Sequence, residues 1–93
     1  MLERDIERVL TRAVKDRGGM SFKFVSPARA GVPDRIVIAP GGRVSFVELK
    51  TIGGALSKKQ SWQIERMLKL GADVHVLYGM TDVLEFINIM FPA

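Results

Sequence analysis

The stretch GVPDRIVIAPGGRVSFVELK, residues 31–50, decides the fold of this chain. Its β-branched run Ile36-Val37-Ile38 predicts a strand that begins next to Asp34 and is buried on both faces. Pro40-Gly41-Gly42 is typical of a hairpin turn, and the residues after it alternate as a returning strand. We therefore expect an antiparallel hairpin that begins at one acid and ends on Glu48-Leu49-Lys50.

Helical and strand patterns on either side of the hairpin complete the domain. Residues 2–17 carry apolar side chains at helical spacing and stop at two glycines, and residues 20–25 predict a strand beside the hairpin. Beyond the hairpin, Ser57 and Gln60 have the spacing of a capping box, which predicts a second helix that ends at Gly71.

The last part of the chain predicts one more strand and one more helix. Residues 73–78 form the expected fourth strand, and because it is reached through a helix we expect it to run parallel to its neighbour. Thr81 is expected to cap a short helix from Asp82 to about Met90. The order is αβββαβα, which indicates one α/β domain over residues 1–93 with a mixed four-stranded sheet.

The composition is that of a soluble globular domain with a cationic surface. Of 93 residues, 47% are hydrophobic and 26% charged, and the formal net charge of +4 favours a polyanionic partner. The chain has no cysteine, which excludes a disulfide framework and a thiolate metal site. No apolar run reaches the ~20 residues of a membrane span. We expect a cytoplasmic protein that does not contact a membrane.

Two acids and a lysine converge at the end of the predicted hairpin. Period-two geometry puts Glu48 and Lys50 on one strand face, and the hairpin brings Asp34 beside them. Two carboxylates repel each other unless something such as a hard divalent cation neutralises them, and the backbone carbonyl of Leu49 can supply a further ligand. Such an ion activates water toward a phosphodiester. Lys50 can orient or deprotonate that water, or stabilise the transition state.

Each part of this pattern also has an ordinary explanation. An acid and a lysine on one strand face usually form an exposed ion pair worth less than ~1 kcal/mol. Pro-Asp is common at turns. The combination of Pro33-Asp34, the hairpin and Glu48-Leu49-Lys50 in an αβββαβ order is much rarer, and it predicts metal-dependent phosphodiester hydrolysis.

One acid of the first predicted helix lies in an unusual position. At about 100° per residue, Glu3 projects between Leu10 and Val14, inside the apolar arc, and Glu7 lies at the edge of that arc. A charge near a helix N-terminus is favourable by itself and explains Glu3 without any chemistry. An acid directed at the sheet is the alternative, and these residues alone leave both open.

Together these motifs resemble the PD-(D/E)xK nuclease superfamily, and more closely the stand-alone VRR-NUC (virus-type replication-repair nuclease) domains of bacteriophages. The resemblance covers nearly the whole chain, and its most specific part is Gly31-Val32-Pro33-Asp34-Arg35 followed by Phe46-Val47-Glu48-Leu49-Lys50. The other matching segments are Glu3 with Ile6 and Leu10, Lys23-Phe24-Val25-Ser26-Pro27, and Leu56-Ser57-x-x-Gln60.

The resemblance implies a restriction-endonuclease-like fold and a DNA nuclease that uses Mg²⁺ or Mn²⁺. It implies Asp34 and Glu48 as metal ligands and Lys50 as the catalytic lysine. It also implies Glu3 as an active-site acid near the metal and Gln60 as a polar residue that faces the site. On this basis we favour a site role for Glu3 and Gln60 over a helix-end charge and a cap alone. Glu7, one turn after Glu3, is the alternative helix acid.

The resemblance also bears on the substrate. Stand-alone members resemble Holliday-junction resolvases, which implies a four-way DNA junction and a two-fold homodimer. A short chain has little room for a module that reads bases, which favours recognition of DNA shape. A nicking or flap endonuclease with the same site is one alternative, and a catalytically inert DNA-binding module is the other. If a phage encodes the chain, we expect it in the host-cell cytoplasm.

Trp62 is expected on the polar side of the second helix, where a core tryptophan is unusual. An exposed aromatic of this size indicates an interface, and we favour a second subunit over a stacked base. The apolar last helix is the other candidate dimer surface. His75 is interpreted as structural. Five basic residues flank the proposed site and are candidate phosphate contacts, namely Lys23, Arg29, Arg35, Lys58 and Lys59.

Overall fold

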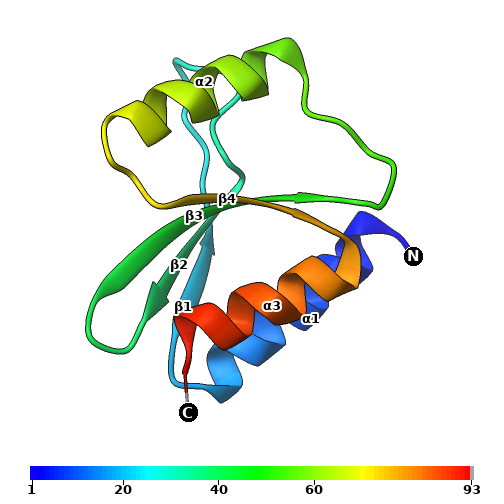
Figure 1. The fold of residues 1–93 in the computed structure, drawn as a ribbon, viewed down its shortest axis with the longest axis vertical. Helices are drawn as coiled ribbons and strands as arrows, with labels where there is room; N and C mark the ends of the chain where they lie inside the picture. Colours follow the sequence, from blue (N-terminus) through cyan, green and yellow to red (C-terminus); the bar gives the residue numbers. More distant parts are fainter. Residues whose placement is uncertain (93) are drawn as a thin grey trace.

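The computed structural model describes residues 1–92 and shows a four-stranded sheet with helices on both faces (Figure 1). Its elements are α1 (Glu3–Asp16), β1 (Met20–Lys23), β2 (Arg35–Ala39), β3 (Arg43–Lys50), α2 (Lys58–Lys69), β4 (Val74–Tyr78) and α3 (Gly79–Met90). The strands lie in the order β1-β2-β3-β4, with the first three antiparallel and β4 parallel to β3. This architecture confirms the predicted αβββαβα order and the mixed sheet.

The β2–β3 hairpin determines which carboxylates face each other. Its turn closes where the Gly42 N–H donates to the Ala39 carbonyl across 3.0 Å. Gly42 and the glycine before it both have positive φ, at 82° and 91°, which glycine adopts without strain. The register pairs Arg35 with Val47, and one step further toward the open end Asp34 comes opposite Glu48.

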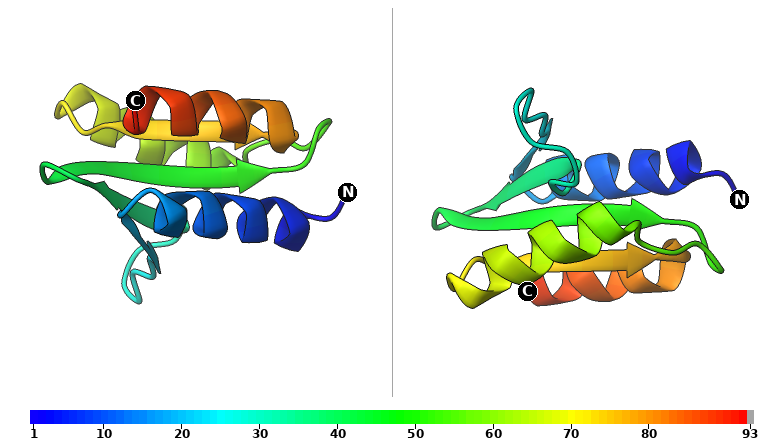
Figure 2. Two further views of the ribbon diagram at one scale, coloured as in Figure 1. Left: turned by 90° about the horizontal axis from the view of Figure 1, so that it is seen from below. Right: turned by 90° about the horizontal axis from the view of Figure 1, so that it is seen from above.

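The hydrophobic core lies between the sheet and one helical layer. α1 and α3 run side by side on one face of the sheet, and α2 lies on the other (Figures 1 and 2). The core residues are Ile6, Leu10 and Val14 of α1, Val37, Ala39, Val47, Leu49 and Leu77 of the sheet, and Val83, Phe86, Ile87 and Met90 of α3. Most apolar residues of α3 are therefore used inside the domain, contrary to the expectation of a free dimer surface. None of the helices over residues 1–92 is long and apolar enough to span a membrane.

β2 is buried on one face only, whereas both faces were expected to be buried. Val37 and Ala39 are buried, while Ile36 and Ile38 are half-buried. The physical reason is the position of α2, which packs mainly against β4 and leaves the β1–β2 part of its face open (Figure 1). Exposed apolar residues stand on this open face in cross-strand register with the two isoleucines, namely Met20, Phe22 and Val44.

Two element boundaries differ from the sequence-based expectation. α3 begins at Gly79, because the Asp82 carboxylate accepts a hydrogen bond from the Tyr78 N–H across 2.8 Å and so caps the helix. Thr81, expected as the cap, lies inside the first turn. β1 ends at Lys23, although the next N–H, that of Phe24, still donates to the Asp34 carbonyl across 2.7 Å.

Candidate functional site

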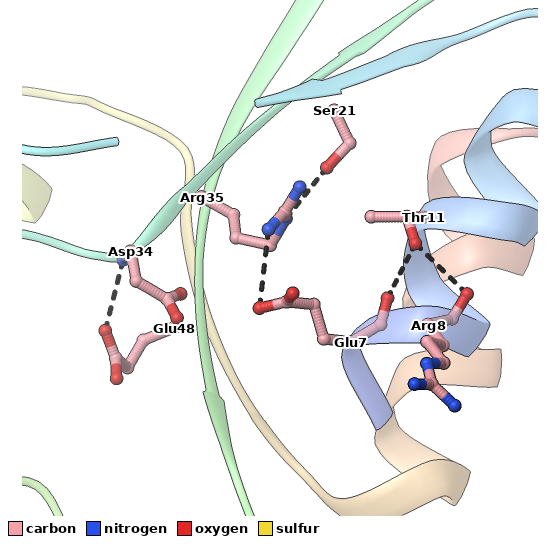
Figure 3. A network of polar contacts seen from close by, with 7 residues as sticks. All are labelled: Glu7, Arg8, Thr11, Ser21, Asp34, Arg35 and Glu48. Carbon is pink, nitrogen blue, oxygen red and sulfur yellow. Dashed lines mark hydrogen bonds and ion pairs between the residues drawn. The ribbon is translucent and has the colours of Figure 1, made fainter. Parts of the chain in front are cut away.

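Asp34 and Glu48 meet at the open end of the β2–β3 hairpin (Figure 3). The Asp34 N–H donates a hydrogen bond to Glu48 Oε1 across 3.2 Å. Glu48 is only 4% exposed, which is rare for a carboxylate and indicates a special environment. The structure thus brings together the two acids that the hairpin was expected to pair.

Both carboxyl groups are held in surroundings that disfavour their ionised forms. Burial raises the pKa of Asp34, the negative charge of Glu3 raises it further, and Arg35 opposes both. Burial likewise raises the pKa of Glu48, with the charge of Asp34 second and the charge of Lys50 opposing. Two neighbouring acids whose pKa values are both raised, mainly by burial, form a place where a bound cation is favourable.

The pair also leaves one oxygen without a partner. Asp34 Oδ1 is buried and has no hydrogen-bond partner within residues 1–92. Leaving a buried acceptor unsatisfied costs ~1–3 kcal/mol, and a hard cation would satisfy it. No group of three or more His, Cys, Asp or Glu side chains converges in the same described range, so a cation would need backbone oxygen or water as further ligands. Such a donor set fits Mg²⁺ or Mn²⁺ and does not suit a closed zinc site.

Lys50 and Gln60 both reach the same oxygen of Glu48. Lys50 Nζ lies 3.6 Å from Glu48 Oε2, and Gln60 Nε2 donates a hydrogen bond to that atom across 3.2 Å. The Lys50 side chain is 18% exposed, so little water screens its charge. A strand residue and a helix residue therefore converge on one carboxylate. The period of β3 predicted the position of Lys50, and the resemblance implied that Gln60 faces the site.

Gln60 caps α2 at the same time. Its Oε1 accepts a hydrogen bond from the Ser57 N–H across 2.9 Å, and its own N–H donates to Ser57 Oγ across 3.1 Å. The loop before Asp34 packs tightly on this turn, because a Cβ at Gly31 would lie 2.5 Å from the Lys59 carbonyl oxygen. Gly31 therefore holds the beginning of α2 close to the carboxylate pair.

Leu49 and the acids of α1 take different positions. The Leu49 side chain is fully buried in the core, so its carbonyl is the group that it can offer to a cation. Glu7 is partly buried and forms an ion pair with Arg35, with 3.4 Å between Glu7 Oε2 and Arg35 Nη1. Glu3 is exposed, and its charge raises the pKa of Asp34 more than that of Glu7 does. This ranking favours Glu3 as the helix acid nearest the pair.

Arg35 is not the candidate phosphate contact that its sequence position suggested. It is 7% exposed, and its Nε donates to Ser21 Oγ across 2.9 Å on the side opposite Glu48 (Figure 3). The signal that was missed is the alternation of β2, in which Arg35 shares the core face with Val37 and Ala39. The other four flanking cations are exposed, namely Lys23, Arg29, Lys58 and Lys59.

Trp62 lies on the outer side of α2, as the polar pattern of that helix predicted. The side chain is 55% exposed, and the Arg66 guanidinium lies 4.6 Å from the ring centroid. A cation at this distance is attracted by the face of the ring. His75 packs edge-on against Phe86, with 4.8 Å between the ring centroids, which suits its structural interpretation.

Comparison with known proteins agrees with this geometry. The sequence model of the VRR-NUC domain matches residues 4–81. The chain belongs to the VRR-NUC family. "Putative nuclease p44" of Acyrthosiphon pisum secondary endosymbiont phage 1 is 40% identical over an 88-residue alignment that covers 92% of this chain and 95% of that protein. A solved structure titled "VRR_NUC domain" is similar with a TM-score of 0.87 at 30% identity, covering 92% of this chain and 94% of the other.

Family membership identifies this VRR-NUC chain as a nuclease domain. The matched segment contains five of the six expected site residues, namely Asp34, Glu48, Leu49, Lys50 and Gln60. Glu3 lies one residue before it, so the family match neither supports nor weakens its assignment. The structural match extends over nearly all of both chains, which confirms the α/β architecture expected from the sequence.

Proposed function

We propose that this VRR-NUC domain is a Mg²⁺- or Mn²⁺-dependent endonuclease that hydrolyses phosphodiester bonds in DNA. The observation that carries the proposal is the meeting of Asp34 and Glu48, in which Asp34 Oδ1 is buried and has no hydrogen-bond partner in the described part of the chain. The net charge of +4 favours a polyanionic substrate.

Asp34 and Glu48 would hold the ion, together with the carbonyl of Leu49. When bound, such an ion supplies Lewis-acid polarisation of the phosphodiester and makes water a better nucleophile. Lys50 carries its charge 3.6 Å from Glu48, where it can orient water or stabilise negative charge that develops on the phosphate. Gln60 fixes the orientation of the Glu48 carboxylate, and Glu3 is the additional acid.

We further propose a four-way DNA junction as the substrate and a homodimer as the active form. A junction with two-fold symmetry is cut symmetrically by two sites related by the same symmetry. The open sheet face offers a surface for the second copy, because Met20, Phe22 and Val44 are exposed there and carry no charge. A DNA backbone gains nothing from such a face, whereas a second copy buries it.

Cleavage of labelled branched DNA tests the activity. Wild type and Asp34→Asn are incubated with a four-way junction, a 5′ flap, a nicked duplex and a linear duplex, with Mg²⁺ or with chelator. We expect wild type with Mg²⁺ to cut the junction first and Asp34→Asn to cut nothing. Equal cutting by both proteins would remove Asp34 from the mechanism. Equal cutting of flap and junction would favour the flap or nicking endonuclease, and binding without cleavage at any metal concentration would favour an inert DNA-binding module.

Light scattering coupled to gel filtration tests the homodimer separately. Val44→Lys places a charge on the open sheet face, and Trp62→Lys places one on the outer side of α2, the other exposed apolar surface and the one that the sequence favoured as an interface. We expect Val44→Lys to be monomeric and Trp62→Lys to remain dimeric. A monomeric wild type contradicts the homodimer, and the reverse pattern moves the interface to α2.

A further inference from the structure

Arg35 is a charged side chain buried between α1 and the sheet. Its side chain is 8% exposed, yet it is engaged at two nitrogens (Figure 3). Nε donates to Ser21 Oγ on β1 across 2.9 Å, and Nη1 lies 3.4 Å from Glu7 Oε2 on α1. A buried guanidinium is costly unless it keeps such partners, so these contacts fix α1 and β1 relative to β2.

This group of three residues, the Glu7–Arg35–Ser21 clamp, lies next to the carboxylate pair. Arg35 follows Asp34 in the chain, and the Asp34 N–H donates to Glu48, whereas the Arg35 side chain reaches α1 (Figure 3). Glu3 precedes Glu7 by one helical turn, and residues four apart lie on the same helix face. The position of Glu7 therefore determines where Glu3 stands relative to Asp34.

The remaining contacts of α1 do not fix its position as sharply. The helix is held on the sheet by Ile6, Leu10 and Val14, all nearly fully buried. Apolar burial is non-directional, so it favours contact without selecting one axial position of the helix. An ion pair joins two particular groups and weakens as they move apart, so the Glu7–Arg35 pair favours one position of the first turns of α1 over its neighbours.

We propose that Arg35 is a positioning residue, which through Glu7 holds the first turns of α1 so that Glu3 faces Asp34 and Glu48. This inference rests on the proposed metal site and assigns the two helix acids different tasks. Glu7 anchors the helix, and Glu3 serves the ion. Residues that orient metal ligands typically change metal affinity or activity about 10- to 100-fold when they are replaced, which sets the expected size of the effect.

Titration calorimetry with Mn²⁺ alone, repeated with Mg²⁺, measures this effect without cleavage. The proteins are wild type, Arg35→Lys, Glu7→Gln, Glu3→Gln and the double variant Glu3→Gln/Glu7→Gln. We expect Arg35→Lys and Glu7→Gln each to lower the affinity for the ion about tenfold. Lysine keeps the positive charge beside Asp34 but cannot reach Ser21 and Glu7 together, so its loss of affinity reports geometry. The matched control is Arg12→Gln, which breaks an exposed ion pair with Asp16 on the same helix and should leave affinity unchanged.

The double variant decides how Glu7 acts. If Glu7 works by placing Glu3, then Glu3→Gln/Glu7→Gln binds no more weakly than Glu3→Gln alone. If instead the fold losses of affinity in the two single variants multiply in the double variant, Glu7 acts on the ion directly and the proposal is overturned. Variants that melt at a lower temperature but keep wild-type affinity where they are folded would also overturn the proposal.

If Arg35→Lys does not fold, Glu7→Gln carries the test, since the Glu7 side chain is 35% exposed. A wild type that binds neither ion overturns the proposed function and this proposal together, whereas wild-type binding with unaffected variants overturns only the role of Arg35.

Discussion

Gln60 donates a hydrogen bond from its side-chain Nε2 to Glu48 Oε2 across 3.2 Å. The oxygen of the same amide accepts from the Ser57 N–H across 2.9 Å. One side chain therefore joins the beginning of α2 to the end of β3. Helix capping and the orientation of a proposed metal ligand depend on the same residue, and variants at Ser57 and Gln60 can separate the two.

Ser57→Ala should affect stability but not cleavage. The variant loses the hydroxyl that accepts the Gln60 N–H, a cap worth about 1 kcal/mol, and keeps the amide on Glu48. Gln60→Ala should be destabilised to a similar extent and should also cut a four-way junction about tenfold more slowly, because Glu48 loses its orienting donor. Urea unfolding and cleavage rates measure the two effects. If both variants cut equally slowly, only the cap matters.

The pKa shifts of Asp34 and Glu48 predict how metal changes the dependence of stability on pH. Both pKa values are raised, so the folded state binds these protons more tightly than the unfolded state does. Their stabilising contribution is present below the unfolded values, about pH 4, and is lost as the pH rises through the folded values. Mg²⁺ binds the ionised pair and should therefore raise Tm at pH 8 much more than at pH 4.

Asp34→Asn is the control for that measurement. Without metal it should melt at or above the wild-type Tm at pH 8, because one of two repelling carboxylates is gone. It should also show no Tm increase with Mg²⁺. Calorimetry of wild type and Asp34→Asn, each with and without Mg²⁺ at pH 4 and at pH 8, gives the four Mg²⁺-dependent Tm changes to compare. A Mg²⁺ effect of equal size at pH 4 and pH 8, or one that Asp34→Asn retains, would contradict the carboxylate pair as the binding site.

The site could be predicted from the sequence where local geometry alone fixes a side chain. Two residues on one strand must share a face, so Glu48 and Lys50 were placed correctly by period two, and the hairpin turn set Asp34 opposite Glu48. These placements need no knowledge of how the layers pack. For Gln60, the capping-box spacing predicted only the contact with Ser57, and the resemblance implied that its side chain faces the site.

What the sequence could not supply depends on contacts between distant elements. The alternation of β2 places Arg35 on the core face, but its partner Glu7 comes from another element, and only the packed structure shows that α1 lies over that face. The half-buried Ile36 depends in the same way on where α2 lies. The start of α3 was missed because Tyr78 takes the N-cap position with its N–H bonded to the Asp82 side chain inside the helix, and tyrosine is not a residue that N-cap propensity predicts there.

Asp73 predicts a second dependence of stability on pH, with the opposite sign. Burial alone would raise the pKa of Asp73, but hydrogen bonds from Ser45 and His75 outweigh it and hold the pKa below its ordinary value of 3.8. This contribution is present above the unfolded pKa and is lost as the pH falls through the folded one. The Asp73 side chain is 50% exposed, so screening keeps the effect below ~1 kcal/mol.

Asp73→Asn tests that sign. It should be slightly less stable than wild type at pH 7 by urea unfolding, and the difference should shrink as the pH falls below the ordinary pKa of 3.8. Ser45 lies three residues before Glu48 along β3, about 10 Å away, so cleavage should be unaffected. A difference that grows in acid would show that the hydrogen bonds from Ser45 and His75 do not favour the carboxylate.

Gly31→Ala tests whether the loop before Asp34 sets the position of α2. Gly31 has φ of 89°, and an added Cβ would lie 2.5 Å from the Lys59 carbonyl oxygen. Gly71, just beyond the other end of α2, has φ of 87° and nothing within 4 Å of an added Cβ. Gly71→Ala should therefore lower the free energy of unfolding only by the ~1–2 kcal/mol of a left-handed alanine, and Gly31→Ala by a further ~1–3 kcal/mol from overpacking.

Because the collision is with the backbone beside Gln60, Gly31→Ala should also bind Mn²⁺ more weakly, whereas Gly71→Ala should not. Equal unfolding free energies and equal Mn²⁺ affinities for the two variants would mean that the loop does not hold the helix.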